Sequence, residues 1–103
     1  IEVLFRKDQS ENFTYLKVTG HSPQTFGKPG ENLLCAAVSA LTQSLVLFLQ
    51  KTGSIEKVQI DKGHLEFSLP SPNRDTNTAV GVIREGLLDL ANQYPDILKL
   101  LEK

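Results

Sequence analysis

The feature that most constrains the fold is an almost continuously apolar stretch over residues 33–49. Only four polar residues interrupt it, namely Ser39, Thr42, Gln43 and Ser44. The stretch predicts a helix of about five turns that begins at Gly30-Glu31-Asn32 and ends near Gly53. Because such a helix is apolar on nearly all sides, it must be buried on more than one side. We therefore expect it to pack between a sheet and another helix, or against a second subunit.

A membrane span is the alternative for this stretch. A bilayer requires roughly 20 predominantly apolar residues, and this run is shorter and carries four polar side chains. The first seven residues show no basic segment followed by a long apolar one, so we expect no secretory signal. The sequence thus favours a buried helix in a cytoplasmic protein without membrane contact.

Alternating apolar and polar residues predict a β-hairpin on each side of this helix. The first has strands near 1–8 and 12–20, and the second extends over 54–69 around a turn at 61–63. The imperfect alternation in 12–20 leaves open which of its faces is buried. The polar segment 73–77 precedes a second helix, whose apolar residues share one face: Ala79, Val80, Ile83, Leu87, Leu90, Ala91 and Tyr94. We expect one or two further helical turns over 96–103.

The resulting order is ββαββα. Two hairpins can form a four-stranded, mostly antiparallel sheet, and two long helices then cover one face in a two-layer α+β fold. A chain of 103 residues can bury one core but not two, so we expect a single domain over 1–103.

Composition excludes several classes of function. The chain has 11 Lys and Arg residues against 12 Asp and Glu residues, and this near-neutral balance offers no general attraction to nucleic acid or anionic lipid. A sheet that stacks RNA bases on Phe13 and Tyr15 ranks last, because the Gly-aromatic RNA-binding signature is missing. The single cysteine, Cys35, excludes an intramolecular disulfide and a Cys-rich zinc site. One Cys and two distant His residues have no metal-ligand spacing, so we expect no metal and no cofactor.

Cys35 and His21 are the residues best suited to chemistry, since a nearby base or a positive environment activates a thiol. If Asn32 is the N-cap, Cys35 is the third helical residue, where the helix dipole favours a thiolate. The backbone N–H groups of Cys35 and Ala36 could then stabilise an oxyanion. The Gly- and Pro-rich loop over 20–30 is long enough to bring His21 over the start of the helix.

The residues by themselves also allow an inert interpretation. An unpaired Cys in an apolar segment is usually a small core residue, and a His at a strand end is usually an ordinary polar terminus. Ser39, one turn after Cys35, either supports a site there or bonds to a backbone carbonyl of its own helix. His64, beside the second hairpin turn, is expected to be solvated.

Two segments resemble the ribosomal-processing cysteine protease family, Prp. One is Gly20-His21, and the other is Gly30-Glu31-Asn32-Leu33-Leu34-Cys35-Ala36-Ala37-Val38-Ser39-Ala40-Leu41-Thr42-Gln43. The similarity continues through both hairpins, the late Gly86-Leu87 helix and the Tyr94-Pro95 ending, and so covers most of the chain.

The resemblance implies a homodimeric bacterial endopeptidase. Its Cys/His dyad would remove a short N-terminal extension from a large-subunit ribosomal protein, the twenty-seventh of its set, through an acyl-enzyme. By motif position, His21 is the base and Cys35 the nucleophile, with Gly20 beside them and Ser39 in support. The loop residues Ser22, Phe26, Gly27 and Gly30 would form a lid or substrate wall; an ordered connection with Phe26 packed inward is the alternative.

The chain departs from the family pattern at two positions. The family usually has Asp where this chain has Asn32, and Ala where it has Ser22. Asn caps a helix as well as Asp does, but it supplies no carboxylate to orient or stabilise the histidine. The remaining alternative is a non-catalytic, ribosome-associated or protein-binding dimeric module, in which the first helix forms the dimer surface and Cys35 is buried.

Overall fold

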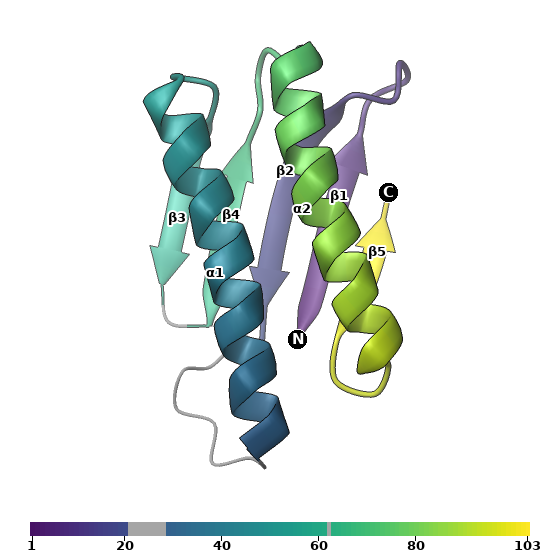
Figure 1. Ribbon diagram of the computed structural model, residues 1–103. Helices are drawn as coiled ribbons and strands as arrows, with labels where there is room; N and C mark the ends of the chain where they lie inside the picture. The colour runs from purple at the N-terminus through teal and green to yellow at the C-terminus, as the bar shows by residue number, and fades with distance from the viewer. Residues whose placement is uncertain (21–28, 62) are drawn as a thin grey trace.

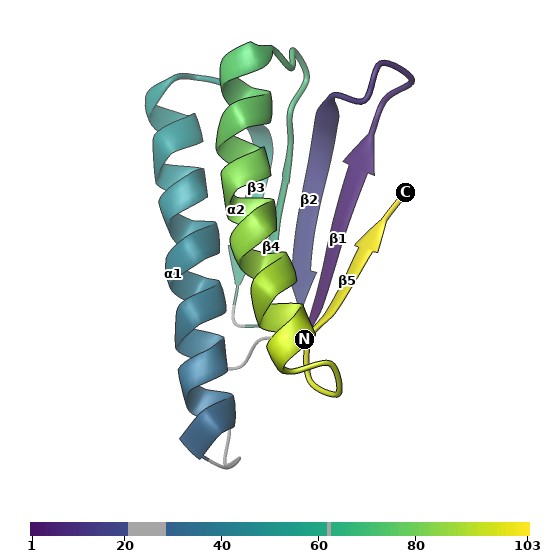
Figure 2. The same ribbon diagram turned by 45° about the vertical axis from the view of Figure 1, so that its right-hand side comes forward.

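The protein forms two layers, a five-stranded sheet and two antiparallel helices that cover one of its faces (Figures 1 and 2). The computed structural model describes residues 1–20, 29–61 and 63–103, without the side chains of 29–32. The α+β class and the two helices on one face are confirmed. In chain order the elements are β1 (Glu2–Lys7), β2 (Phe13–Thr19), α1 (Pro29–Lys51), β3 (Glu56–Asp61), β4 (His64–Ser68), α2 (Arg74–Gln93) and β5 (Lys99–Glu102).

Both predicted hairpins are present, and they meet at the centre of the sheet. The strand order is β3-β4-β2-β1-β5. β1 pairs antiparallel with β2, β3 pairs antiparallel with β4, and the hairpins join where β2 runs antiparallel to β4. The start of β4 therefore lies beside the end of β2, which leads into the His21 loop.

The prediction of helical turns over 96–103 is wrong, because these residues supply the fifth strand. β5 pairs parallel with β1, with Glu2 opposite Lys99 and Phe5 opposite Glu102. The terminal ammonium of Ile1 donates to the carbonyl oxygen of Ile97 over 2.7 Å. The sheet is consequently mixed and has five strands in place of the expected four.

A shift in strand register explains the imperfect alternation of β2. Arg6 pairs with Tyr15, but the next residue, Lys7, pairs with Phe13. Phe13 thereby joins the buried face, where its ring centroid lies 5.7 Å from that of Phe5. The face under the helices also contains the buried Val3, Leu16, Val18, Leu65 and Phe67, and the opposite face has no helix over it.

α1 is buried on two sides and exposed on a third. Its residues Leu34, Val38, Leu45, Val46 and Leu49 belong to the same core cluster as the buried strand residues. α2 approaches closely at Gly86, where an added Cβ would lie 3.2 Å from Leu41 Cδ1. The expected packing against a sheet and a second helix is thus confirmed. Leu33, Leu47 and Phe48 remain exposed.

Residues 33–51 of α1 are long and apolar enough to cross a bilayer, judged by length and composition. The core helix of a globular protein satisfies the same criterion, because burial in protein selects apolar residues as lipid does. In the structure, Leu34, Val38, Val46 and Leu49 of this segment are at most 2% exposed within the protein. This burial accounts for the apolar sequence of the sheet-facing side.

α2 begins earlier than expected, because the polar segment 73–77 caps the helix and forms its first turn. The Asn73 side chain accepts a hydrogen bond from the Thr76 backbone N–H, and the Thr76 hydroxyl accepts one from the Asn73 N–H. This reciprocal pair satisfies two N–H groups at the helix start. In the middle of the helix, Arg84 forms an ion pair with Glu102 and so connects α2 to β5.

Candidate active site

Cys35 lies near the start of α1, and it is buried, with 5% of its surface exposed. The helix begins at Pro29, so the prediction that Asn32 is the N-cap is wrong, and Cys35 is the seventh helical residue. Only the first four N–H groups of a helix lack a partner within it, and those of Cys35 and Ala36 lie beyond them. The position of Cys35 therefore gives no support to the predicted backbone oxyanion site, which stays a prediction.

Gly20 determines how the chain leaves β2 toward His21. Its φ of +79° lies in the left-handed region, which glycine adopts without the strain that a Cβ causes. Its N–H donates to the carbonyl oxygen of Gly63 over 3.1 Å. The end of β2 is thus tied to the turn before β4. The predicted site residues His21, Ser22, Phe26 and Gly27 lie outside the described residues. Of Gly30 and Asn32, only the helical backbone is described.

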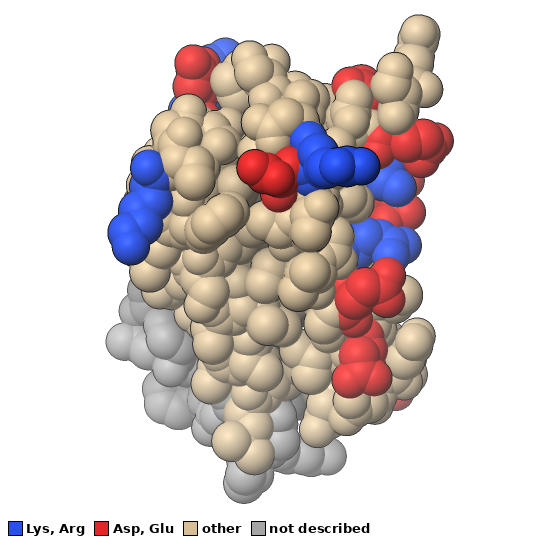
Figure 3. All heavy atoms as spheres, turned by 45° about the horizontal axis from the view of Figure 1, so that its top comes forward, with Lys and Arg blue, Asp and Glu red and all other residues tan. Residues whose placement is uncertain are grey.

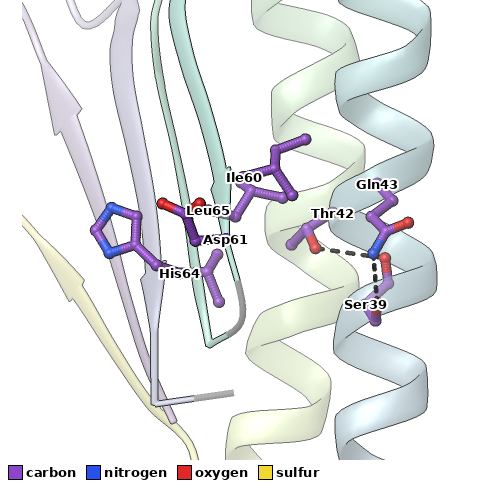
Figure 4. Close-up of a pocket in the computed structure, with 8 residues that line it drawn as sticks. Ser39, Thr42, Gln43, Ile60, Asp61, His64 and Leu65 are labelled. Atoms are coloured by element: carbon purple, nitrogen blue, oxygen red, sulfur yellow. Dashed lines mark hydrogen bonds between the residues drawn. The ribbon is translucent and has the colours of Figure 1, made fainter. Parts of the chain in front are cut away.

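Ser39 follows Cys35 by one helical turn and bonds to a residue that the sequence analysis did not assign. Gln43 Nε2 donates to Ser39 Oγ over 2.8 Å (Figure 4). The nearby Thr42 hydroxyl behaves differently, because it donates to the Val38 carbonyl oxygen over 2.8 Å. A bond from the side chain to a helix carbonyl, which was one of the two predictions for Ser39, is thus found at Thr42. The four-residue spacing of Ser39 and Gln43 could have indicated their contact, since such residues are neighbours on a helix.

A small pocket of about 40 Å³ opens beside Ser39, between α1 and the β3–β4 hairpin. Ser39, Thr42 and Gln43 line its helix side, and the apolar side chains of Ile60 and Leu65 line the sheet side (Figure 4). Leu65 is buried, whereas Ile60 is 51% exposed. An exposed isoleucine next to a pocket is a candidate contact for an apolar group of a ligand.

His64 belongs to a hydrogen-bonded cluster on the uncovered face of the sheet, where its side chain stays partly solvated, with 27% of its surface exposed. Its ring points away from α1 in Figure 4, and Nε2 lies 2.8 Å from Glu66 Oε1. The Tyr15 hydroxyl donates to the other oxygen of the Glu66 carboxylate. Sequence periodicity had no signal for this cluster, because its members come from two strands.

Electrostatics within this cluster keep the phenol neutral and the carboxylate charged. Burial, followed by the hydrogen bond to Glu66, raises the pKa of Tyr15 to about 12. The hydrogen bonds from Tyr15 and then His64 hold the pKa of the Glu66 carboxyl below its usual value. The Arg6 guanidinium carbon lies 5.0 Å from the centre of the Tyr15 ring. His64 is thus engaged with partners that lie away from the Cys35 helix.

In the part of the chain that the structure describes, no three His, Cys, Asp or Glu residues lie close enough together to hold a metal ion. The described groups are the buried thiol of Cys35 and, one and two helical turns later on α1, the hydrogen-bonded hydroxyl of Ser39 and amide of Gln43.

Comparison with known proteins relates this arrangement to a protein family. Residues 1–99 match the family described as "Cysteine protease Prp". No curated protein sequence gives a significant match.

Among solved structures, the chain is similar to an essential ribosomal processing protease Prp from S. aureus, crystallised with a substrate peptide. The TM-score is 0.84 at 19% identity, over 99% of this chain and 98% of that one. A second S. aureus structure, with a covalently linked product peptide, has a TM-score of 0.84 at 20% identity, over 100% and 99% of the two chains. A Streptococcus mutans protein has a TM-score of 0.81 at 21% identity, over 99% and 97%. These structures share the fold.

Proposed function

Because the chain belongs to the cysteine protease Prp family and is a cysteine protease, we propose that it trims a ribosomal protein. The substrate would be the twenty-seventh protein of the large subunit, carrying an N-terminal extension that must be removed for ribosome maturation. The S. aureus protein of the same fold is a ribosomal processing protease, which supports this substrate class. Such work takes place in the cytoplasm. The family assignment decides against the non-catalytic alternative.

The observation that carries the proposal is that this cysteine protease chain contains one cysteine. A cysteine protease requires a thiolate nucleophile, and Cys35 is the residue in this chain that can supply it. Its burial fits a nucleophile that is shielded from bulk water, in which electrostatic interactions are stronger.

The base follows from a comparison of the chain's two histidines. His64 is bonded to Glu66, and its ring points away from α1. His21 immediately follows Gly20, whose backbone is tied to the turn before β4. We propose His21 as the partner of Cys35, with Gly20 setting the direction in which the chain leaves the strand.

The proposed reaction is acyl transfer in two steps. His21 removes the proton from Cys35, and the sulfur attacks the carbonyl carbon of the scissile peptide bond. The tetrahedral intermediate expels the amine, which takes its proton from His21, and an acyl-enzyme remains. Water, deprotonated by His21, then attacks the thioester and releases the carboxylic acid and the thiol. We retain Asn32 as a proposed supporting residue.

We propose that the substrate passes over the pocket beside Ser39. This pocket lies one helical turn beyond Cys35, and Ile60 presents an exposed apolar side chain to it. Ser22, Phe26 and Gly27, together with Gly30 in the first turn of α1, would form a further wall of the substrate site. The uncharged amide and hydroxyl groups of Gln43 and Ser39 can bond to an extended peptide backbone.

We also propose a homodimer that uses the outer surface of the helix layer. Leu47 and Val82 are 65% and 64% exposed, and Val82 lines a groove with Phe48, Ala79 and Ile83. Figure 3 shows a broad area over the helices without charged side chains. An uncharged apolar surface suits a second copy of itself, because the pairing places no like charges together.

The dimer proposal predicts that Val82→Glu converts the protein to a monomer in sedimentation velocity experiments. A buried glutamate would have to lose its hydration in the interface. The exposed Asn92→Glu on the same helix is the matched control, and it should leave the sedimentation coefficient unchanged. A monomeric wild type, or a Val82→Glu dimer, would show the surface assignment to be wrong.

The main proposal is tested by incubating the purified protein with the extended ribosomal protein and with the same protein lacking its extension. We expect one cut, at the end of the extension, and no cut in the shortened form. Intact mass spectrometry of the product identifies the bond. An extended substrate that stays intact would refute the proposed substrate, while cleavage of both forms at many bonds would refute the processing role.

A further inference from the structure

The exposed face of α1 has a pattern that is symmetric about Ala40. Leu33 and Leu47 lie seven residues before and after it, and Ala36 and Ser44 lie four residues before and after it. Steps of four and seven residues return to the same face of a helix. All five residues are exposed, Leu33 to 71% and Leu47 to 65%. This face therefore has small residues at its centre and a large apolar residue toward each end.

Such a face is suited to a crossing of two identical helices. Two packed helices are closest at their crossing point, where the axes are about 8 to 10 Å apart, and they diverge toward their ends. Small side chains at the centre permit the close approach, and the leucines fill the wider space at the ends. Residues 33–50 contain no charged residue, so the pairing buries no charge. A second copy of α1 thus complements this face in both shape and polarity.

Charge and helix dipoles favour the antiparallel orientation of the two helices. Lys51 is exposed in the last turn of α1. Parallel helices would place both Lys51 side chains, and both negative ends of the helix dipoles, side by side, whereas antiparallel helices keep each pair apart. A two-fold axis at Ala40 then brings Leu33 of one copy to the level of Leu47 of the other.

An apolar groove lies at that level, between α1 and α2. The first turns of α1 extend past the ends of the strands and of α2, with Leu33 exposed among them (Figures 1 and 2). The groove has a volume of about 280 Å³. A cavity of about 150 Å³ already holds a benzene-sized group, so a leucine side chain fits this groove. Its walls are formed by Ser44, Leu45, Phe48, Ala79, Val82 and Ile83.

We propose that two copies of the chain pair through antiparallel α1 helices that cross at Ala40, with Leu33 of each copy in the groove of the other. The inference rests on the homodimer proposed above, and it specifies the position of the two-fold axis and the main contact. Because the same surface is used on both copies, the leucine contact occurs twice in each dimer.

Cysteine cross-linking tests the crossing point, in a Cys35→Ala background that leaves only the introduced thiols. Ala40→Cys should form a disulfide-linked dimer under mild oxidation, because the two copies of this residue face each other within the Cα separation of about 4 to 7 Å that a disulfide spans. Ala36→Cys, also exposed, is the matched control. Its two copies would lie eight residues apart along the helix axis, about 12 Å, which a disulfide cannot span.

We expect Ala36→Cys to cross-link at least tenfold more slowly than Ala40→Cys, as measured by non-reducing gel electrophoresis. Ser44→Cys should be equally slow. The double variant Ala36→Cys/Ser44→Cys should cross-link rapidly, because a two-fold axis at Ala40 places residue 36 of one copy opposite residue 44 of the other.

Leu33→Ala tests the groove. It should raise the dissociation constant of the dimer at least tenfold in sedimentation equilibrium experiments, since an apolar contact is lost twice. Leu101→Ala, a change at another exposed leucine, lies on β5 outside the proposed interface and should leave the dissociation constant unchanged.

The outcomes separate the pairing from the homodimer on which it rests. A dimer in which Ala36→Cys cross-links as fast as Ala40→Cys would overturn the crossing point alone, and an unchanged dissociation constant for Leu33→Ala would overturn the groove contact. A monomeric wild type would overturn both the pairing and the homodimer. Neither measurement uses a substrate, so both are independent of whether the ribosomal protein is cleaved.

Discussion

Replacement of His21 by Gln is expected to slow cleavage of the extended ribosomal protein by a factor of about 10² to 10⁴, the usual contribution of a general acid and base. Cys35→Ala is expected to abolish cleavage, because alanine cannot form the acyl-enzyme. The measurement is the rate of appearance of the shortened protein under single-turnover conditions. The Cys35→Ala sample also shows whether any cleavage comes from a contaminating protease.

His64→Gln is the matched control for the first variant. Its ring bonds to Glu66 on the uncovered face of the sheet and points away from α1, and a glutamine amide can replace that bond. We expect its cleavage rate to stay within about threefold of the wild type, as for substitutions outside the chemical site. Equal losses in the two histidine variants, or cleavage by Cys35→Ala, would be incompatible with the proposed dyad.

The largest effect on stability is expected from Phe5→Ala, which should lower the free energy of unfolding by about 3 to 5 kcal/mol. The Phe5 side chain is fully buried beneath the helices, and its ring packs against that of Phe13. Removing the ring deletes apolar contacts and leaves a cavity in a core to which both helices contribute. Urea unfolding, followed by circular dichroism, measures the change.

The neighbouring residue provides a control from the other face of the same strand. Leu4 is only partly buried, and its side chain lies on the side of the sheet that no helix covers. Leu4→Ala should therefore cost about 1 kcal/mol, the typical value for a substitution without a large cavity. Equal losses for the two variants would mean that the helix-covered face is not the main core.

Sequence periodicity was sufficient for the two hairpins and for both helices. The alternation around 61–63 corresponds to β3 and β4, and the helical spacing from Ala79 to Tyr94 corresponds to most of α2. These predictions succeed because the period of the apolar residues follows directly from strand and helix geometry. The boundaries were less accurate, since a polar first turn such as Arg74-Asp75-Thr76-Asn77 has no apolar period.

The fifth strand was beyond the reach of local pattern. Residues 97–101 alternate too briefly to distinguish a strand from a helical turn, and the conformation follows from pairing with β1 at the other end of the chain. The same holds for Phe13, whose burial depends on a register shift between β1 and β2. Long-range pairing overrides local propensity in such short segments.

The candidate site shows the same division. The motif around Cys35 and the Gly20-His21 pair identified the family, and the match over residues 1–99 agrees with it. The motif did not predict that the helix begins at Pro29, before Asn32. It also did not predict the surroundings of His64. The hydrogen bond between Gln43 and Ser39 is seen only in the structure, although the helical spacing of the two residues is visible in the sequence.

By itself the sequence determined the α+β class, the apolar core helix and the family, and it supplied Cys35 as the proposed nucleophile. These properties depend on residue identity and on short repeats along the chain. Tertiary structure decided the fifth strand, the buried face of β2 and the cluster of Tyr15 with Glu66 and His64. Each of these depends on which distant segments lie side by side. That arrangement is set by the free energy of the whole packed core, which cannot be read from any single segment of the chain.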